Sequence, residues 1–212
     1  MALALLVVAL VATGILLLNR PGDISAGPVE VGGVGTANAQ PIEVGVDYSF
    51  GYMLWNYGKK PATVERVRVL GVTGPIEVLD VWARQHPSGP KPHTFMFLFG
   101  FPPPEYPSKP LAEENTVPVP TLSDTGSAYE GLQLVVGVRS TGAGIGRIQG
   151  IEVTYRIGER RFRNSSNGRG FLCAPAAEYR ADGPKFHECG NIDEDTWDDK
   201  FVDVRVLPDK RK

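Results

Sequence analysis

The sequence predicts an all-β fold, a β-sandwich preceded by one N-terminal transmembrane helix. Three observations predict the sandwich. Several short segments alternate apolar and polar residues, which is the pattern of strands buried on one face. Beyond residue 20 no ten-residue window shows a clear helical period, and the chain holds 25 glycines and 18 prolines, which end helices and punctuate strands.

The N-terminal segment Ala2–Leu18 carries no charged residue. An apolar run of this kind forms a helix in lipid, and it would rise about 26 Å, the short end of a membrane span. We therefore expect residues 1–20 to anchor the chain in the lipid bilayer as a single pass. A cleaved signal sequence is the alternative, because Ala37-Asn38-Ala39 fits a cleavage motif, although it lies far beyond the apolar run.

Residues 21–40 are small and polar, and we expect them to form a flexible linker. Residues 41–212 are long enough for one domain with its own core. Arg20 after the apolar segment favours a cytoplasmic domain. The two cysteines and the β-rich composition favour the opposite side, and we expect the domain outside the cytoplasm, at the cell membrane.

The first predicted strand runs from Ile42 to Phe50 with apolar residues at every second position, and it continues through 53–55 to a turn at 56–61. Gly158-Glu159 predicts a two-residue hairpin turn, and the glycine-rich run 142–146 predicts a hairpin connection. The other predicted strands are 63–70, 77–83, 130–140, 147–157, 160–163 and 201–207.

The turn between the first two of these strands reads Asn56-x-Gly58-x-x-Pro61-x-x-Val64. This strand–turn–strand opening resembles that of immunoglobulin-like domains of bacterial cell-surface proteins. The resemblance covers about 25 residues, consists of turn chemistry, and implies an immunoglobulin-like β-sandwich without assigning a role to any residue.

An irregular region, 87–120, holds ten of the eighteen prolines and the alternating phenylalanines Phe95, Phe97, Phe99 and Phe101. These rings would share one strand face and fill the core. Phe101 and Tyr106 flank the prolines, and two interpretations stay open for them: they cover the core, or they contact a protein partner.

Two chemistries compete for Cys173 and Cys189, the only cysteines. They fit a disulfide, and with His187 they also fit part of a zinc site whose fourth ligand is unspecified. His86, His93 and Met96 are residue types that suit copper, but positions 93 and 96 point to opposite faces of a strand.

Nothing in the sequence predicts catalysis, because it holds no Gly-x-Ser-x-Gly motif and only three histidines. A net charge of −2 gives no reason to expect a nucleic-acid partner. We therefore expect no enzyme activity, no cofactor and no bound metal. The predicted function is a non-catalytic binding or accessory role in the cell envelope, through an unidentified protein partner. The alternative is an extracytoplasmic copper- or zinc-binding domain.

Overall fold

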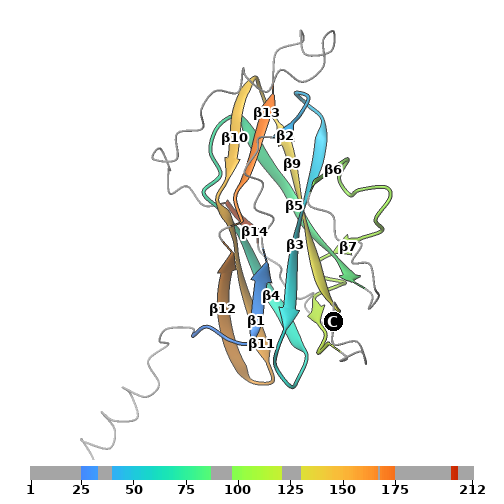
Figure 1. Cartoon of the computed structure of the whole chain (residues 1–212), viewed down its shortest axis with the longest axis vertical. Coiled ribbons are helices and arrows are strands. Elements are labelled where there is room, and N and C mark those ends of the chain that lie inside the picture. Colours follow the sequence, from blue (N-terminus) through green and yellow to red (C-terminus); the bar gives the residue numbers. More distant parts are fainter. Residues whose placement is uncertain are drawn as a thin grey trace, which may run out of the picture.

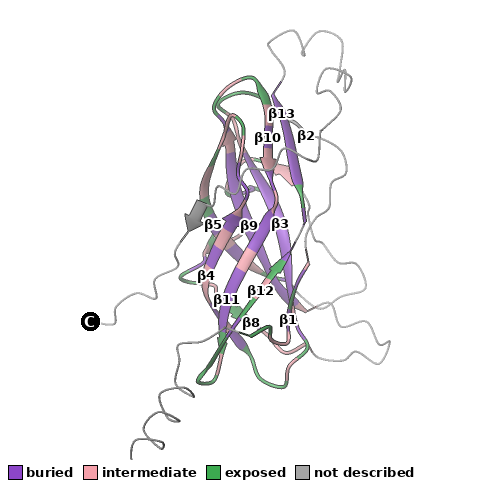
Figure 2. Ribbon diagram, turned by 90° about the vertical axis from the view of Figure 1, so that its left-hand side faces the viewer, coloured by how far each residue is buried: buried purple, intermediate pink, exposed green. Residues whose placement is uncertain are grey.

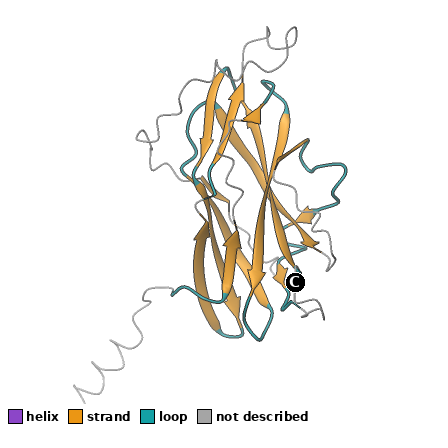
Figure 3. Ribbon diagram, viewed as in Figure 1, coloured by secondary structure: helices purple, strands orange, loops and turns teal. Residues whose placement is uncertain are grey.

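The computed structural model describes residues 25–32, 40–86, 97–120, 130–166, 168–174 and 202–204. Within these ranges the regular structure consists of strands, and no helix occurs (Figure 3). The strands are β1 Val29–Gly32, β2 Gln40–Pro41, β3 Asp47–Asn56, β4 Ala62–Leu70, β5 Ile76–His86, β6 Phe97–Phe99, β7 Lys109–Pro110, β8 Thr116–Val117, β9 Gly131–Ser140, β10 Gly144–Ile148, β11 Gly150–Ile157, β12 Arg160–Ser166, β13 Gly170–Ala174 and β14 Val202–Val204. The predicted all-β class is confirmed.

The strands form two layers (Figure 1). One layer is a six-stranded sheet in the order β1-β3-β9-β5-β7, with β6 paired to β3. The other layer consists of the five-stranded sheet β12-β11-β4-β14, with β8 beside β4, and the three-stranded sheet β10-β13-β2. We call the first layer the β3–β9 sheet and the five-stranded part of the second the β4–β11 sheet.

Alternating residues of both layers meet in one core, drawn as buried in Figure 2. Phe50, Tyr52 and Val136 project from the β3–β9 sheet, while Val67 and Val153 project from the β4–β11 sheet. Each of these five side chains is at most 1% exposed. Burial of two facing apolar rows is the main stabilising contribution in a two-layer β protein, and here it defines a sandwich.

Part of the expected linker belongs to the sandwich, which corrects its predicted boundaries. β1 pairs with β3 from Val29 opposite Asn56 to Gly32 opposite Met53. Val29 is 0% and Val31 8% exposed. Three alternating residues, Val29-Glu30-Val31, are too short a signal to distinguish a strand from a linker in the sequence, and the structure supplies the partner that decides it.

Of three glycine-containing segments, two differ from the structure expected from the sequence and one agrees with it. Gly45 has φ +79°, so the alternation that starts at Ile42 breaks there, and Val44 is 49% exposed. The glycine-rich run does not form a hairpin, because β10 pairs with β13 and not with the preceding β9. Gly158, with φ +58°, does form the predicted hairpin, in which Ile157 lies opposite Arg160.

Several sequence expectations lie outside the described residues. Within the described part, no helix is long and apolar enough to cross a bilayer. Ala2–Leu18 is not described, so the anchor stays a prediction. The same holds for four residues named above as ligands or disulfide partners: His93, Met96, His187 and Cys189.

Candidate functional site

The proline-rich segment 100–108 folds back over the outer face of the β3–β9 sheet. Ser49 of β3 donates a hydrogen bond from Oγ to the carbonyl oxygen of Gly100 at 2.6 Å. The ring of Phe101 lies over Gly137 of β9, where a Cβ atom would stand 2.4 Å from Cγ of that ring. Phe101 also meets Trp82 of β5 edge-to-face, with the ring centroids 5.8 Å apart. Gly137 is therefore needed for the segment to approach the sheet.

Tyr106 lies further along the same segment and packs on a polar pair. The guanidinium carbon of Arg84 is 4.7 Å from the centre of the Tyr106 ring. Arg84 donates from Nε to Oε1 of Gln133 at 2.8 Å, and Gln133 is 0% exposed. Burial lowers the pKa of Arg84, and the neighbouring Tyr106 acts in the opposite direction. The segment thus covers polar as well as apolar groups of its own sheet.

The structure brings Phe101 and Tyr106, the predicted partner-contact residues, to one face. Both are half-buried against the β3–β9 sheet, which agrees with a covering role. Because each keeps some exposed surface, contact with a partner remains a prediction for this pair.

The alternating phenylalanines do not all fill the core, and this corrects the expectation. Phe97 stacks on Tyr48 at 5.2 Å between ring centroids, as predicted. Phe99 shares that face but is 67% exposed, because β6 is a three-residue strand at the sheet edge. Gly100, with φ +86°, then turns the chain, so Phe101 reaches the opposite face.

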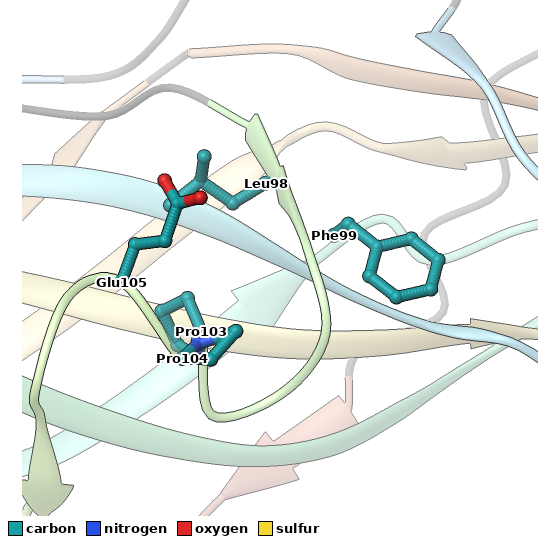
Figure 4. A pocket seen from close by; sticks show the side chains of 5 residues that line it. All are labelled: Leu98, Phe99, Pro103, Pro104 and Glu105. Carbon is teal, nitrogen blue, oxygen red and sulfur yellow. The ribbon is translucent and has the colours of Figure 1, made fainter.

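A small apolar pocket adjoins β6, and the ring of Phe99 points away from the other side chains that line it (Figure 4). Leu98, Phe99, Pro103, Pro104 and Glu105 line it, and its volume is about 130 Å³. A pocket of this order takes one compact apolar group, since an apolar cavity of about 150 Å³ holds a benzene molecule. We call Phe99 and this pocket the β6 surface. The sequence signal for it was present in the aromatic run, but only the edge position of β6 shows which ring is exposed.

A second surface is the outer face of the β4–β11 sheet, which carries arginines on three neighbouring strands. Glu65 accepts from Arg156 at 3.4 Å and from Arg161 at 2.6 Å. Glu152 accepts from Arg68 at 3.2 Å and lies 3.7 Å from Arg163. We call the five arginines at positions 66, 68, 156, 161 and 163 the arginine face.

The N-terminal segment joins this sheet through side-chain clamps. The Asn164 side chain accepts from Gly27 N at 3.2 Å and donates to the carbonyl oxygens of Gly27, at 3.0 Å, and of Val29. Val29 N donates to the hydroxyl oxygen of Tyr155 at 3.1 Å. Burial raises the pKa of Tyr155, so this hydroxyl stays protonated. We call these contacts the N-terminal clamp.

The cysteine and metal hypotheses are left as predictions. Cys173 is 6% exposed in β13, whereas Cys189 lies outside the described residues. His86, in β5, is 3% exposed. The described residues contain no group of three or more metal-ligating side chains. Mass spectrometry of the non-reduced protein tests the disulfide.

Comparisons with known proteins add nothing to the fold class, which follows from the strands themselves. No protein-family model matches the chain, and no curated protein matches it. Among solved structures, an ASH/PapD-like domain of human CEP192 (PapD-like domain 7) is similar over 74% of this chain and 91% of that one. Its identity is 11% and its TM-score 0.35, so the likeness carries no argument about this chain. The described chain is an all-β sandwich, and its bacterial cell-surface resemblance stays a prediction.

Proposed function

We propose that this protein is a single-pass membrane protein whose sandwich lies outside the cytoplasm and has a non-catalytic binding or accessory role in the cell envelope. The β6 surface provides the main support for the proposed binding role. An aromatic side chain that is 67% exposed, on an edge strand that also borders an apolar pocket, is typical of an interface anchor.

The scaffold under this surface is held firmly, which favours binding. Phe97 packs on Tyr48 and Phe50, and the Gly100 amide donates to the carbonyl oxygen of Asp47 at 2.8 Å. A preorganised surface loses little conformational entropy on association. Glu105 at the pocket rim adds a negative charge that favours a partner with a basic group beside its apolar one.

The position of β1 argues against cleavage at the Ala37-Asn38-Ala39 motif. Cleavage after Ala39 would remove β1, and with it Val29 and Val31 from the core. Loss of two buried valines and a strand would cost several kcal/mol, which is a large part of the stability of a domain. This cost supports our proposal that the chain is not cut at this motif.

The β6 surface is tested by Phe99→Ala, with Tyr57→Ala as the matched control. Tyr57 is 68% exposed in the turn after β3, so both changes remove an equally exposed aromatic ring. After cross-linking in native membranes, Phe99→Ala should lose a cross-linked partner that the control retains. Equal recovery by both variants would refute the β6 surface as the binding site.

The anchor is tested separately by carbonate extraction of membranes. The chain should remain in the membrane fraction, because burial of Ala2–Leu18 in lipid is strongly favourable. A mature N-terminus at Gln40 would refute an uncleaved anchor. Metal analysis of the purified chain tests the copper or zinc alternative, and a stoichiometric metal that survives dialysis would favour it.

A further inference from the structure

We propose that the arginine face lies against anionic phospholipid headgroups of the membrane that holds the chain. This inference rests on the proposed anchor and adds to it an orientation of the sandwich and a lipid class. It concerns the outer face of the β4–β11 sheet, which the β6 surface does not include. Charge, position and guanidinium chemistry each support it.

The charge of the face is positive among the described residues of β4, β11 and β12. Five arginines and two glutamates, Glu65 and Glu152, lie on these three strands of the face, so arginine predominates there. Each glutamate is already shared by two arginines. Asp203 of β14 stands opposite Arg68 in register, so the excess of arginine concentrates toward β12, away from that edge.

The arginines of this face on β12, and Arg156 on the neighbouring strand β11, have more exposed side chains than Arg68 on β4. The side chains of Arg161, Arg156 and Arg163 are 60%, 52% and 44% exposed. Arg156 and Arg161 lie directly opposite each other, an arrangement that is unfavourable in a sheet without an anion between them. Glu65 supplies one carboxylate, and a phosphate of a lipid headgroup would supply further negative charge on the solvent side.

The chain enters the sandwich beside this face. Arg163 N donates to the carbonyl oxygen of Ser25 at 3.2 Å, so the first described residue lies along β12 (Figure 1). Residues 19–24 alone separate Ser25 from the apolar segment that ends at Leu18. Seven extended steps between these two Cα atoms span at most about 25 Å. The anchor thus keeps β12 close to the headgroups.

Guanidinium groups suit this ligand. They bind phosphate oxygens in a bidentate manner and are more weakly hydrated than an ammonium group. Each arginine near an anionic membrane surface strengthens binding by about fivefold. The excess of arginine on this face of a tethered domain therefore favours one orientation, whereas an acidic protein would gain nothing from the short connection to the anchor.

The test uses the full chain, reconstituted in vesicles of phosphatidylcholine alone or with phosphatidylglycerol. A neutral arginine-selective reagent is applied, and the modification rate of each arginine is followed by mass spectrometry. Arg139, 40% exposed on the outer face of the β3–β9 sheet, is the control within the same molecule. Modification of Arg161 and Arg163 should slow by about fivefold or more with phosphatidylglycerol, while Arg139 keeps its rate.

Salt and a substitution make the test specific. At 1 M salt the Debye length falls to about 3 Å, so the protection should disappear. Arg161→Gln should reduce the protection of Arg163, whereas Arg139→Gln should leave it unchanged. These variants remove exposed groups, so the fold is expected to persist, and circular dichroism checks this.

Equal modification rates in both vesicle types would overturn the lipid contact while leaving the anchor intact. Protection by added polyglutamate, without protection by phosphatidylglycerol, would also overturn it and assign the face to an acidic protein. Failure of the chain to stay with either vesicle under carbonate would refute the anchor itself, and with it the proposal that rests on it.

Discussion

Asn164→Ala should weaken the sandwich by releasing the N-terminal clamp. The Asn164 side chain makes three hydrogen bonds to the backbone of Gly27 and Val29. At about 1 kcal/mol each, their loss lowers the free energy of unfolding by about 3 kcal/mol. For a domain of this size that corresponds to a melting temperature about 6–12 °C lower.

Two measurements check this prediction on the full chain in detergent. Thermal unfolding gives the change in stability, and hydrogen exchange should show faster exchange at residues 25–32 than elsewhere. Asn164→Asp should be at least as harmful, because it removes the donor and sets a carboxylate oxygen against two carbonyl oxygens. Ser165→Ala, an exposed neighbour on the same strand, is the control and should unfold like the unmodified protein.

The reasoning would be refuted if Asn164→Ala melted within about 2 °C of the unmodified protein. It would also fail if the loss of protection were spread evenly over the sandwich, because the clamp holds one segment in particular. A stability loss equal to that of Ser165→Ala would show that β1 is held by its pairing with β3 alone.

Three further predictions concern the core and the two surfaces. Glu65→Gln should lower the free energy of unfolding by about 1 kcal/mol at low salt and by less at high salt, because two facing arginines lose their shared carboxylate. Urea unfolding measures this change, and Glu159→Gln, at an exposed glutamate, is the control. Gly137→Ala should displace Phe101 and expose residues 100–108 to hydrogen exchange. In a protein that already carries Phe101→Ala, the same change should have little further effect, and an equal effect with and without the Phe101 ring would contradict the packing. Burial raises the pKa of Tyr52, so stability should be full below pH 10 and fall as the unfolded state ionises above it; Tyr52→Phe should reduce this alkaline loss, measured as the urea midpoint from pH 7 to 11.

Long apolar strands inside the sheets could be predicted from the sequence. The expected segment 130–140 is β9, Gly131–Ser140, and 63–70 is β4, Ala62–Leu70. β9 is buried on both faces and so has an apolar run, whereas β4 is buried on one face and so has apolar residues at intervals.

Short edge strands could not be predicted, because tertiary contacts rather than a local sequence pattern place their residues in strands. β2, β7 and β8 have two residues each, which is too few to show a period. The predicted strand 147–157 is divided between β10 and β11, and Gly150, with φ +152°, begins the second one. Glycine tolerates such a change of direction, but its presence does not show where the chain will use it.

The candidate surfaces could be predicted only in part. The aromatic and proline-rich run indicated where an apolar surface would form, but the exposed ring is Phe99 and not Phe101. The arginines at 156, 161 and 163 were visible in the sequence, yet their alignment with Arg66 and Arg68 depends on the pairing of β4 with β11. That pairing joins residues more than 80 positions apart, for example Arg68 and Glu152, and no local pattern encodes it.

The N-terminal clamp also affects the order in which parts of the sandwich can fold during synthesis. Val29 and Asn164 are 135 residues apart, so β1 leaves the ribosome long before its clamp exists. At about 5–20 residues per second, the interval is about 7–27 s. Throughout it the backbone amide of Val29 lacks the Tyr155 hydroxyl that accepts its hydrogen bond in the complete sandwich. The last third of the chain, rather than the first, therefore determines when the N-terminal strand becomes locked in place.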